Sequence, residues 1–184
     1  MHKSDYAQEV LYIVRWDESQ HQDLELFCRK AAEAEIVNNQ SIDSMAVNKR
    51  EDVGLFLVYI DNSIAGTSYT HRLNDYQDTF RVGTRTCVLP EFRKFKLYFP
   101  KRSLAQAIGL TAYTIKYQWD HAVSCGANNI VWTTNNYGDI HSMKMTNHLH
   151  KIANYNKQYY RFVENKNIYN TDQAVWQLLT GDII

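Results

Sequence analysis

A short basic segment near the chain's two prolines is the first feature that suggests chemistry. Residues 93–102 carry five cations, namely Arg93, Lys94, Lys96, Lys101 and Arg102. Guanidinium and ammonium groups form strong, charge-assisted hydrogen bonds with phosphate oxygens. A phosphate group would therefore suit these residues, with Ser103 after them. The alternative is a solvated loop whose long side chains extend into water.

Two arginines on a predicted strand are candidates for binding an acidic group. Arg81 and Arg85 lie four residues apart, with Gly83 between them. Strand alternation places two such side chains on the same face of a sheet, where they would suit the carboxylate of a substrate. Salt bridges to a neighbouring strand are the alternative interpretation.

Three side chains are candidates for accepting a proton. His71 lies late in a predicted strand, and an imidazole titrates near neutral pH, as a general base requires. Glu91 and Asp78 are the carboxylates nearest the same region. A surface role is the alternative for His71.

The histidines do not form a metal-binding pattern. Helical ligand pairs are typically four residues apart, whereas His148 and His150 are two apart and His141 lies seven before His148. The chain's cysteines are widely separated, so they offer no cysteine-based zinc site either. We therefore expect no metal.

Composition bounds the class of protein. The 184 residues suit a single domain over residues 1–184. Twenty basic side chains balance twenty acidic ones, so there is no global positive field to attract nucleic acid.

There is no apolar run of membrane-spanning length, and the first residues do not read as a signal peptide. An odd number of scattered cysteines argues against disulfides. We expect a cytoplasmic protein without a membrane or nucleic-acid partner.

The hydrophobic periodicity predicts an α/β fold with a mixed sheet. Alternating or continuous apolar runs indicate strands, and apolar residues at helical spacing indicate helices. The run of three strands without an intervening helix implies antiparallel pairing, and a later strand–helix–strand unit implies a parallel pair. The predicted order is strand 10–16, a helix from about 19, a short helix 41–47, strands 54–60, 64–73 and 79–89, helix 101–124, strand 129–134, helix 139–152, and strands 158–166 and 171–179.

This order resembles the fold of the GNAT family of acyl-CoA-dependent N-acyltransferases, over nearly the whole chain. Ile64-Ala65-Gly66-Thr67 is similar to the start of the family's third strand. Val88-Leu89-Pro90-Glu91-Phe92-Arg93 resembles the V-x-P-x-[YF]-R that ends its fourth strand. Gly126-Ala127-Asn128-Asn129-Ile130 is similar to the turn before its fifth strand, and Asn135-Asn136 to the start of its fourth helix.

The resemblance implies an enzyme that binds acetyl-CoA or another acyl-CoA between a splayed fourth and fifth strand. A primary amine, on a small molecule or a protein, would attack the thioester directly. Backbone N–H groups near Cys87, Val88 and Leu89 would bind pantetheine and polarise the thioester carbonyl. Asn135 and Ser142 would contribute to CoA binding, and the acceptor groove would lie beside Arg81, Arg85 and His71. A homodimer is left open.

The chain departs from the family's pattern in its phosphate loop, at its base and at the tyrosine of its fourth helix, where this chain has Met145 or Thr146. The family's phosphate loop contains glycines where this chain has Lys96 and Tyr98, so cations would replace backbone donors. Many members carry a glutamate base about six residues before the motif valine, where this chain has Val82. These departures keep a second hypothesis open: a binding or structural protein that has the fold without the activity.

Overall fold

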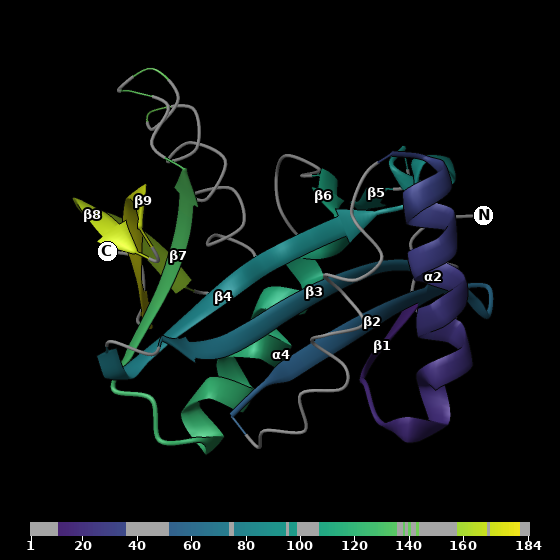
Figure 1. Ribbon diagram of the computed structural model, residues 1–184, viewed down its shortest axis with the longest axis horizontal. Helices are drawn as coiled ribbons and strands as arrows, with labels where there is room; N and C mark the ends of the chain where they lie inside the picture. The colour runs from purple at the N-terminus through teal and green to yellow at the C-terminus, as the bar shows by residue number, and fades with distance from the viewer. Residues whose placement is uncertain are drawn as a thin grey trace.

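The computed structural model describes residues 11–35, 52–73, 76–94, 96–98, 107–135, 138, 140, 143, 158–168 and 170–180 (Figure 1). Its centre is a seven-stranded sheet in the order β1-β2-β3-β4-β7-β9-β8. The β4–β7 pair is parallel and the other pairs are antiparallel. The strands are β1 (Leu11–Arg15), β2 (Gly54–Ile60), β3 (Ser63–Leu73), β4 (Tyr76–Val88), β7 (Asn129–Asn135), β8 (Gln158–Ile168) and β9 (Thr171–Thr180).

Two helices cover opposite faces of the sheet. Helix α2 (His21–Glu33) packs Leu24 and Phe27 on one face, and α4 (Leu110–Ser124) packs Ile115 and Ala122 on the other. Every residue of β2 is buried because alternate side chains enter the two cores. The expected α/β fold with a mixed sheet is therefore confirmed.

Local turn and cap chemistry explains where several elements begin. Asp61 and Asn62 form the two-residue turn between β2 and β3, both with positive φ, as short side chains of this kind tolerate. Before α2, a 3-10 turn η1 (Glu18–Gln20) is closed by a capping box. In it the Asp17 carboxylate accepts the Ser19 N–H at 2.7 Å, and the Asp17 N–H donates to Gln20 Oε1 at 2.7 Å.

The helix predicted over 101–124 is wrong at residues 107–109, the first part of that range that the structure describes. Helix α4 begins at Leu110, and residues 107–109 form β6 (Ala107–Gly109), which pairs with β5 (Lys96–Tyr98) in a small antiparallel hairpin. The hairpin supplies the backbone hydrogen bonds that a longer helix would have supplied. Gly109, a poor helix former, lies at the junction. Lys101, Arg102 and Ser103, predicted at the start of that helix, lie outside the described residues.

Two predicted helices fall largely on residues outside the described ranges. The segment 41–47 lies wholly outside them, and within 139–152 only Ile140 and Met143 are described, both helical. Within the described part of the chain, no helix combines the length and apolarity needed to cross a membrane.

Candidate functional site

A gap between two parallel strands is the main feature of the sheet. β4 and β7 are paired only from Thr79↔Asn129 to Val82↔Trp132. Beyond that point β4 stays paired with β3 as far as Gly66↔Val88, and β7 stays paired with β9 as far as Asn135↔Gln173. The two strands therefore share a closed half and diverge in an open half, as Figure 1 shows. The open half leaves one edge of each strand without a strand partner among the described residues.

A bulge in β4 starts the divergence. Tyr69 pairs with Thr84 and His71 pairs with Arg81, so one residue of β3 lies between these pairs but two residues of β4 do. Strand β4 therefore carries one extra residue there. Gly83 lies in this stretch with φ +69°, a left-handed conformation that favours glycine. The Trp132 indole lies directly against it, because a Cβ placed on Gly83 would be 2.4 Å from Trp132 Nε1.

A buried polar network holds the bulge in place. Gln118 of α4 is fully buried, and its Oε1 accepts the Gly83 N–H at 2.7 Å. Its Nε2 donates to Ser68 Oγ at 2.7 Å and to Thr114 Oγ1 at 2.8 Å. Thr86 completes the network, since its hydroxyl lies 2.8 Å from Ser68 Oγ and donates to the Gly83 carbonyl at 2.9 Å. Side chains thus satisfy the backbone groups of Gly83 that leave the regular ladder.

The hydrogen bonds at the end of β4 decide which amide faces the gap. The Leu89 N–H donates to the Ala65 carbonyl of β3 at 2.9 Å, so Leu89 does not offer its amide to a ligand, contrary to expectation. Successive residues of a strand direct their backbone groups to opposite edges. The N–H and C=O of Val88 therefore point away from β3, toward the gap. Arg93 Nε donates to the Val88 carbonyl at 3.2 Å, which brings a guanidinium to that edge.

The structure describes three of the five predicted cations, Arg93, Lys94 and Lys96. Arg93 and Lys94 follow the 3-10 turn η2 (Pro90–Phe92) and are exposed beside the end of β4. Lys96 opens β5 instead of continuing a loop into a helix. Ser142 lies outside the described residues, as do the predicted cations beyond position 100. On the other side of the gap, Asn135 ends β7, and its Oδ1 accepts from Gln173 Nε2 at 2.6 Å.

Cys87 faces the core and not the gap. Its side chain is buried in the cluster beneath α2, next to Leu89, and its backbone pairs with Thr67. Burial raises the pKa of the Cys87 thiol, and the charge of Arg93 acts in the opposite direction. Only the backbone of Cys87 can therefore contribute near a ligand, by fixing β4 against β3.

His71 and Arg81 lie opposite each other in the closed half of the sheet. His71 is four residues along β3 from Thr67, the partner of Cys87, which is about 13 Å of strand. Its Nδ1 lies 2.9 Å from the Arg72 carbonyl, and its ring packs on Tyr69. The structure therefore does not place His71 beside the gap, where we expected it.

The two predicted arginines are separated by the bulge. Arg81 belongs to the closed half of β4, whereas Arg85 belongs to its open half. The extra residue between them removes the simple alternation from which a common face was predicted.

Glu91 is the carboxylate that lies nearest to Val88 in the chain. It belongs to the η2 turn and is exposed, with Oε1 3.6 Å from Lys30 Nζ of α2. An exposed ion pair of this kind contributes little to stability, so both groups are available to a ligand. In the described residues, no group of three or more His, Cys, Asp or Glu side chains could hold a metal ion.

Comparisons with known proteins agree with this architecture. No family model and no curated protein sequence matches the chain. Solved structures do match over almost the full length of both chains. A protein from Desulfovibrio desulfuricans assigned as an acetyltransferase of the GNAT family has a TM-score of 0.58 at 12% identity, covering 92% of this chain and 98% of that one.

Two N-acetyltransferases of ribosomal proteins give similar values. RimL, the L7/L12 α-N-protein acetyltransferase in complex with coenzyme A, has a TM-score of 0.56 at 10% identity, covering 93% of this chain and 94% of that one. The ribosomal-protein-S18-alanine N-acetyltransferase from Escherichia coli has a TM-score of 0.54 at 11% identity, covering 95% and 96%. The strand order, the divergence of β4 from β7 and these matches lead to one conclusion: the chain has the fold of the GNAT superfamily of acetyltransferases.

Proposed function

We propose that this protein is an acyl-CoA-dependent N-acyltransferase that transfers an acetyl group from acetyl-CoA to a primary amine. The observation that carries the proposal is the gap between β4 and β7, with the Val88 N–H directed into it. An extended pantetheine has amides that can pair with the two free strand edges as an added strand would. The thioester would then lie at the end of the gap where β4 stops.

The cations at the end of β4 would bind the diphosphate of the co-substrate. Arg93 already reaches the Val88 carbonyl, and Lys94 is exposed beside it. Both are close in sequence to the amide that would contact the thioester. Cationic side chains would thus do here what a glycine-rich loop at a helix N-terminus does by backbone donors.

The reaction would be a direct attack of the amine on the thioester carbon. A C–N bond forms, the C–S bond breaks, and negative charge develops on the carbonyl oxygen in between. The Val88 N–H would donate to this oxygen, an interaction that strengthens as the charge develops. The amine loses a proton, for which we propose Glu91 as the acceptor, and the departing thiolate takes up a proton from solvent.

The proposed class of acceptor, a primary amine, is supported by the chemistry of the reaction and by the names of structurally similar proteins. RimL is named as an α-N-protein acetyltransferase, and the Escherichia coli enzyme as a ribosomal-protein-S18-alanine N-acetyltransferase, so a protein amine is one candidate. The exposed Glu91–Lys30 pair lies on the α2 side of the β4 terminus, and a cationic amine could replace Lys30 at that carboxylate. A small-molecule amine satisfies the same chemistry.

A specific observation favours a second candidate, a protein of this fold that binds without transferring. The β5–β6 hairpin occupies residues between η2 and α4, where a glycine-rich loop would lead into a helix in an active relative. Lys96 belongs to that hairpin. This candidate and the enzyme differ in turnover, so one pair of measurements separates them.

The proposed function predicts that coenzyme A raises the melting temperature of the protein. A ligand that binds only the folded state adds RT ln(1 + [L]/Kd) to the free energy of unfolding, about 2.7 kcal/mol at a hundredfold excess over Kd. Thermal denaturation at increasing concentrations of CoA measures it, with pantetheine-free adenosine diphosphate as the control for diphosphate binding alone.

Transfer itself is measured as thiol release from acetyl-CoA in the presence of peptide and small-molecule amines. Stabilisation together with amine-dependent thiol release is the expected result. Stabilisation without thiol release would support the binding protein. An unchanged melting temperature at millimolar CoA would contradict the enzyme and support a binding or structural protein that does not use CoA.

A further inference from the structure

The buried amide of Gln118 lies on the face of α4 that packs against the sheet, where most side chains are apolar. An amide is costly to bury unless its donors and its acceptor all have partners. Gln118 meets that condition, because Nε2 donates to Ser68 and Thr114 and Oε1 accepts from Gly83. The opposite orientation of the amide would place Nε2 against the Gly83 N–H, donor against donor. One side chain of α4 therefore ties the helix to both β3 and β4.

Strand β4 carries a second extra residue beyond the bulge at Gly83. The ladder shifts register between Thr67 and Tyr69, so that Ser68 of β3 lies opposite two residues of β4, 85 and 86. Each bulge exchanges the edge to which all later backbone groups of the strand point. If either bulge closed into regular pairing, the Val88 N–H would turn toward β3. Both bulges are therefore needed to direct that N–H into the gap.

A closed ring of hydrogen bonds spans the two bulges. A hydroxyl has one proton to donate, and Thr86, in the second bulge, gives its proton to the carbonyl of Gly83, in the first, at 2.9 Å. Ser68 Oγ therefore donates to Thr86 Oγ1 across 2.8 Å, and it accepts from Gln118 Nε2 at 2.7 Å. The bond from the Gly83 N–H to Gln118 Oε1, at 2.7 Å, closes the ring. Gln118 is the one member of this ring that does not belong to the sheet.

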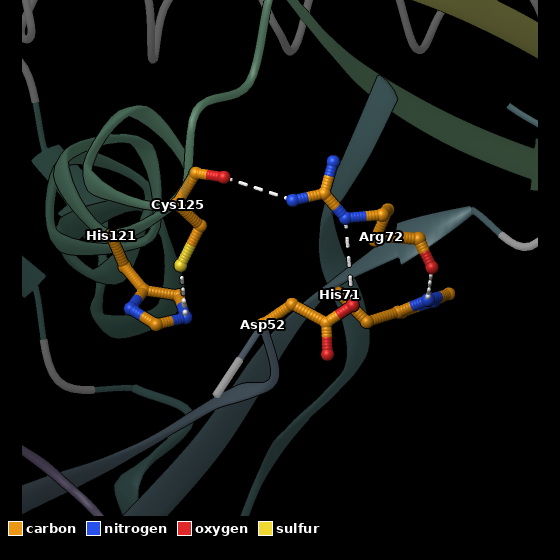
Figure 2. A network of polar contacts seen from close by, with 5 residues as sticks. All are labelled: Asp52, His71, Arg72, His121 and Cys125. Atoms are coloured by element: carbon orange, nitrogen blue, oxygen red, sulfur yellow. Dashed lines mark hydrogen bonds and ion pairs between the residues drawn. The ribbon is translucent and has the colours of Figure 1, made fainter. Parts of the chain in front are cut away.

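The C-terminal end of α4 is fastened to the sheet separately, so Gln118 acts from a fixed helix (Figure 2). Arg72 of β3 donates from Nη2 to the carbonyl of Cys125, just after the helix, at 2.9 Å. The Arg72 Nε lies 3.6 Å from Asp52 Oδ2, and the guanidinium stacks 4.7 Å above the Phe80 ring of β4. These contacts hold α4 against β3 and β4 without any contribution from Gln118.

We propose that Gln118 is a positioning residue for acyl transfer, which holds the Val88 N–H at the thioester from outside the gap. The proposal rests on the proposed function, which assigns that N–H to the developing oxyanion. Burial of Cys87 and Leu89 beneath α2 maintains the register beyond the bulges. Loss of Gln118 would therefore displace the Val88 N–H without turning it to the other edge. Displacement of a group that acts in the transition state lowers kcat more than it weakens substrate binding.

Gln118→Met tests the proposal, because it keeps the length of the side chain and removes its three hydrogen bonds. Steady-state thiol release from acetyl-CoA with an accepted amine is measured for the wild type and the variant. We expect kcat of the folded variant to fall roughly 10–100-fold, the scale of effects caused by misplacing a group at the reacting centre. The KM for acetyl-CoA should change less. A folded Gln118→Met protein with the kcat of the wild type would overturn the inference.

Ala122→Gly is the matched control for a general loss of stability. Ala122 is also buried on α4, and glycine weakens a helix without touching the ring of hydrogen bonds. Its kcat should stay within a few-fold of wild type at a temperature where the protein is folded. If Ala122→Gly lowers kcat as much as Gln118→Met does, the ring has no special part in transfer.

A double-mutant cycle with Val88→Pro shows whether Gln118 acts through the Val88 N–H. If it does, Gln118→Met should lower kcat little further once that N–H has been removed. Independent effects would instead multiply. Losses that multiply would overturn the assignment of Gln118 as the residue that positions this N–H.

Ser68→Ala provides the same test if Gln118→Met does not fold. It removes one hydroxyl and breaks the ring at β3, away from the gap. We expect a several-fold lower kcat that again does not multiply with the effect of Val88→Pro, and an unchanged kcat would overturn the inference. The wild type separates this outcome from a failure of the proposed function. Absence of amine-dependent thiol release in the wild type would overturn both, whereas an active wild type with unaffected variants would overturn only the role of Gln118.

Discussion

Proline in place of Val88 is expected to lower the rate of acetyl transfer by roughly 10²–10³-fold, the typical effect of losing one backbone donor to a developing oxyanion. The substitution removes the N–H that the account assigns to the thioester carbonyl. Steady-state kinetics with acetyl-CoA and an accepted amine measure it. The loss should appear in kcat, because the interaction strengthens as the negative charge develops.

The strand tolerates this proline for a geometric reason. The Val88 N–H points away from β3, since the next amide, that of Leu89, is the one that donates to Ala65. A proline on a strand edge whose N–H side faces no partner removes no ladder hydrogen bond. The variant should therefore unfold close to where the wild type does, which urea denaturation would show.

Val88→Ala is the matched control. It removes the side chain but keeps the amide, so its kcat should stay within a few-fold of wild type. If proline and alanine have the same effect, the side chain of residue 88 matters and its N–H does not. A Val88→Pro protein that is folded and fully active would refute the assignment of the oxyanion donor.

The second large effect is expected at the bulge, where Gly83→Ala should reduce the free energy of unfolding by about 2–5 kcal/mol. About 1–2 kcal/mol comes from placing an L-residue with a Cβ in the left-handed region. About 1–3 kcal/mol more comes from the collision with Trp132, since the new Cβ would lie 2.4 Å from Nε1 and 2.6 Å from Cδ1 of the indole. Urea denaturation measures the total.

Gly126 provides the control for the backbone part of that effect. It also has a positive φ, +80°, but a Cβ there meets nothing within 4 Å. Gly126→Ala should therefore cost only the conformational part, and the difference between the two alanine variants isolates the contact with Trp132. Equal losses in the two variants would mean that the indole shifts aside, and that it does not fix the bulge.

Much of the architecture could be predicted from periodicity and turn chemistry. The run Gly54–Ile60 and the turn at Asp61 and Asn62 are dictated by local sequence, and both appear where predicted. The β5–β6 hairpin could not be predicted, because each strand has three residues and three residues show no period. Leu104 and Ile108 instead fit a helical face, and only the pairing of residues 107–109 with β5 reveals the alternative.

The position of the site along the chain could be predicted from the sequence, but the residue whose N–H faces the gap could not. The segment around Val88 was predicted as the end of the fourth strand, and β4 ends at Val88. Which of Val88 and Leu89 directs its N–H to the gap depends on register, and bulges in β4 set that register. Sequence alone does not fix such bulges.

One residue that holds the bulge in place, Gln118, was not identified from the sequence. Gln118 follows Ile115 by three positions, so both lie on the buried face of α4. A polar side chain on an apolar helix face was the sequence feature that could have identified it. The partner that gives Gln118 its role, the Gly83 N–H, lies 35 residues away in the chain and is brought to it by packing.

The most direct test of the central claim is a proton–nitrogen correlation spectrum of the labelled protein titrated with acetyl-CoA. The account predicts that the Val88 amide shifts strongly and saturably, together with amides along the open half of β4 and β7, such as Thr86 and Thr134. Amides of the closed half, such as Phe80 and Ile130, should move little. A Val88 resonance that stays in place at saturating acetyl-CoA, or shifts gathered instead in the closed half of β4 and β7, would contradict the account.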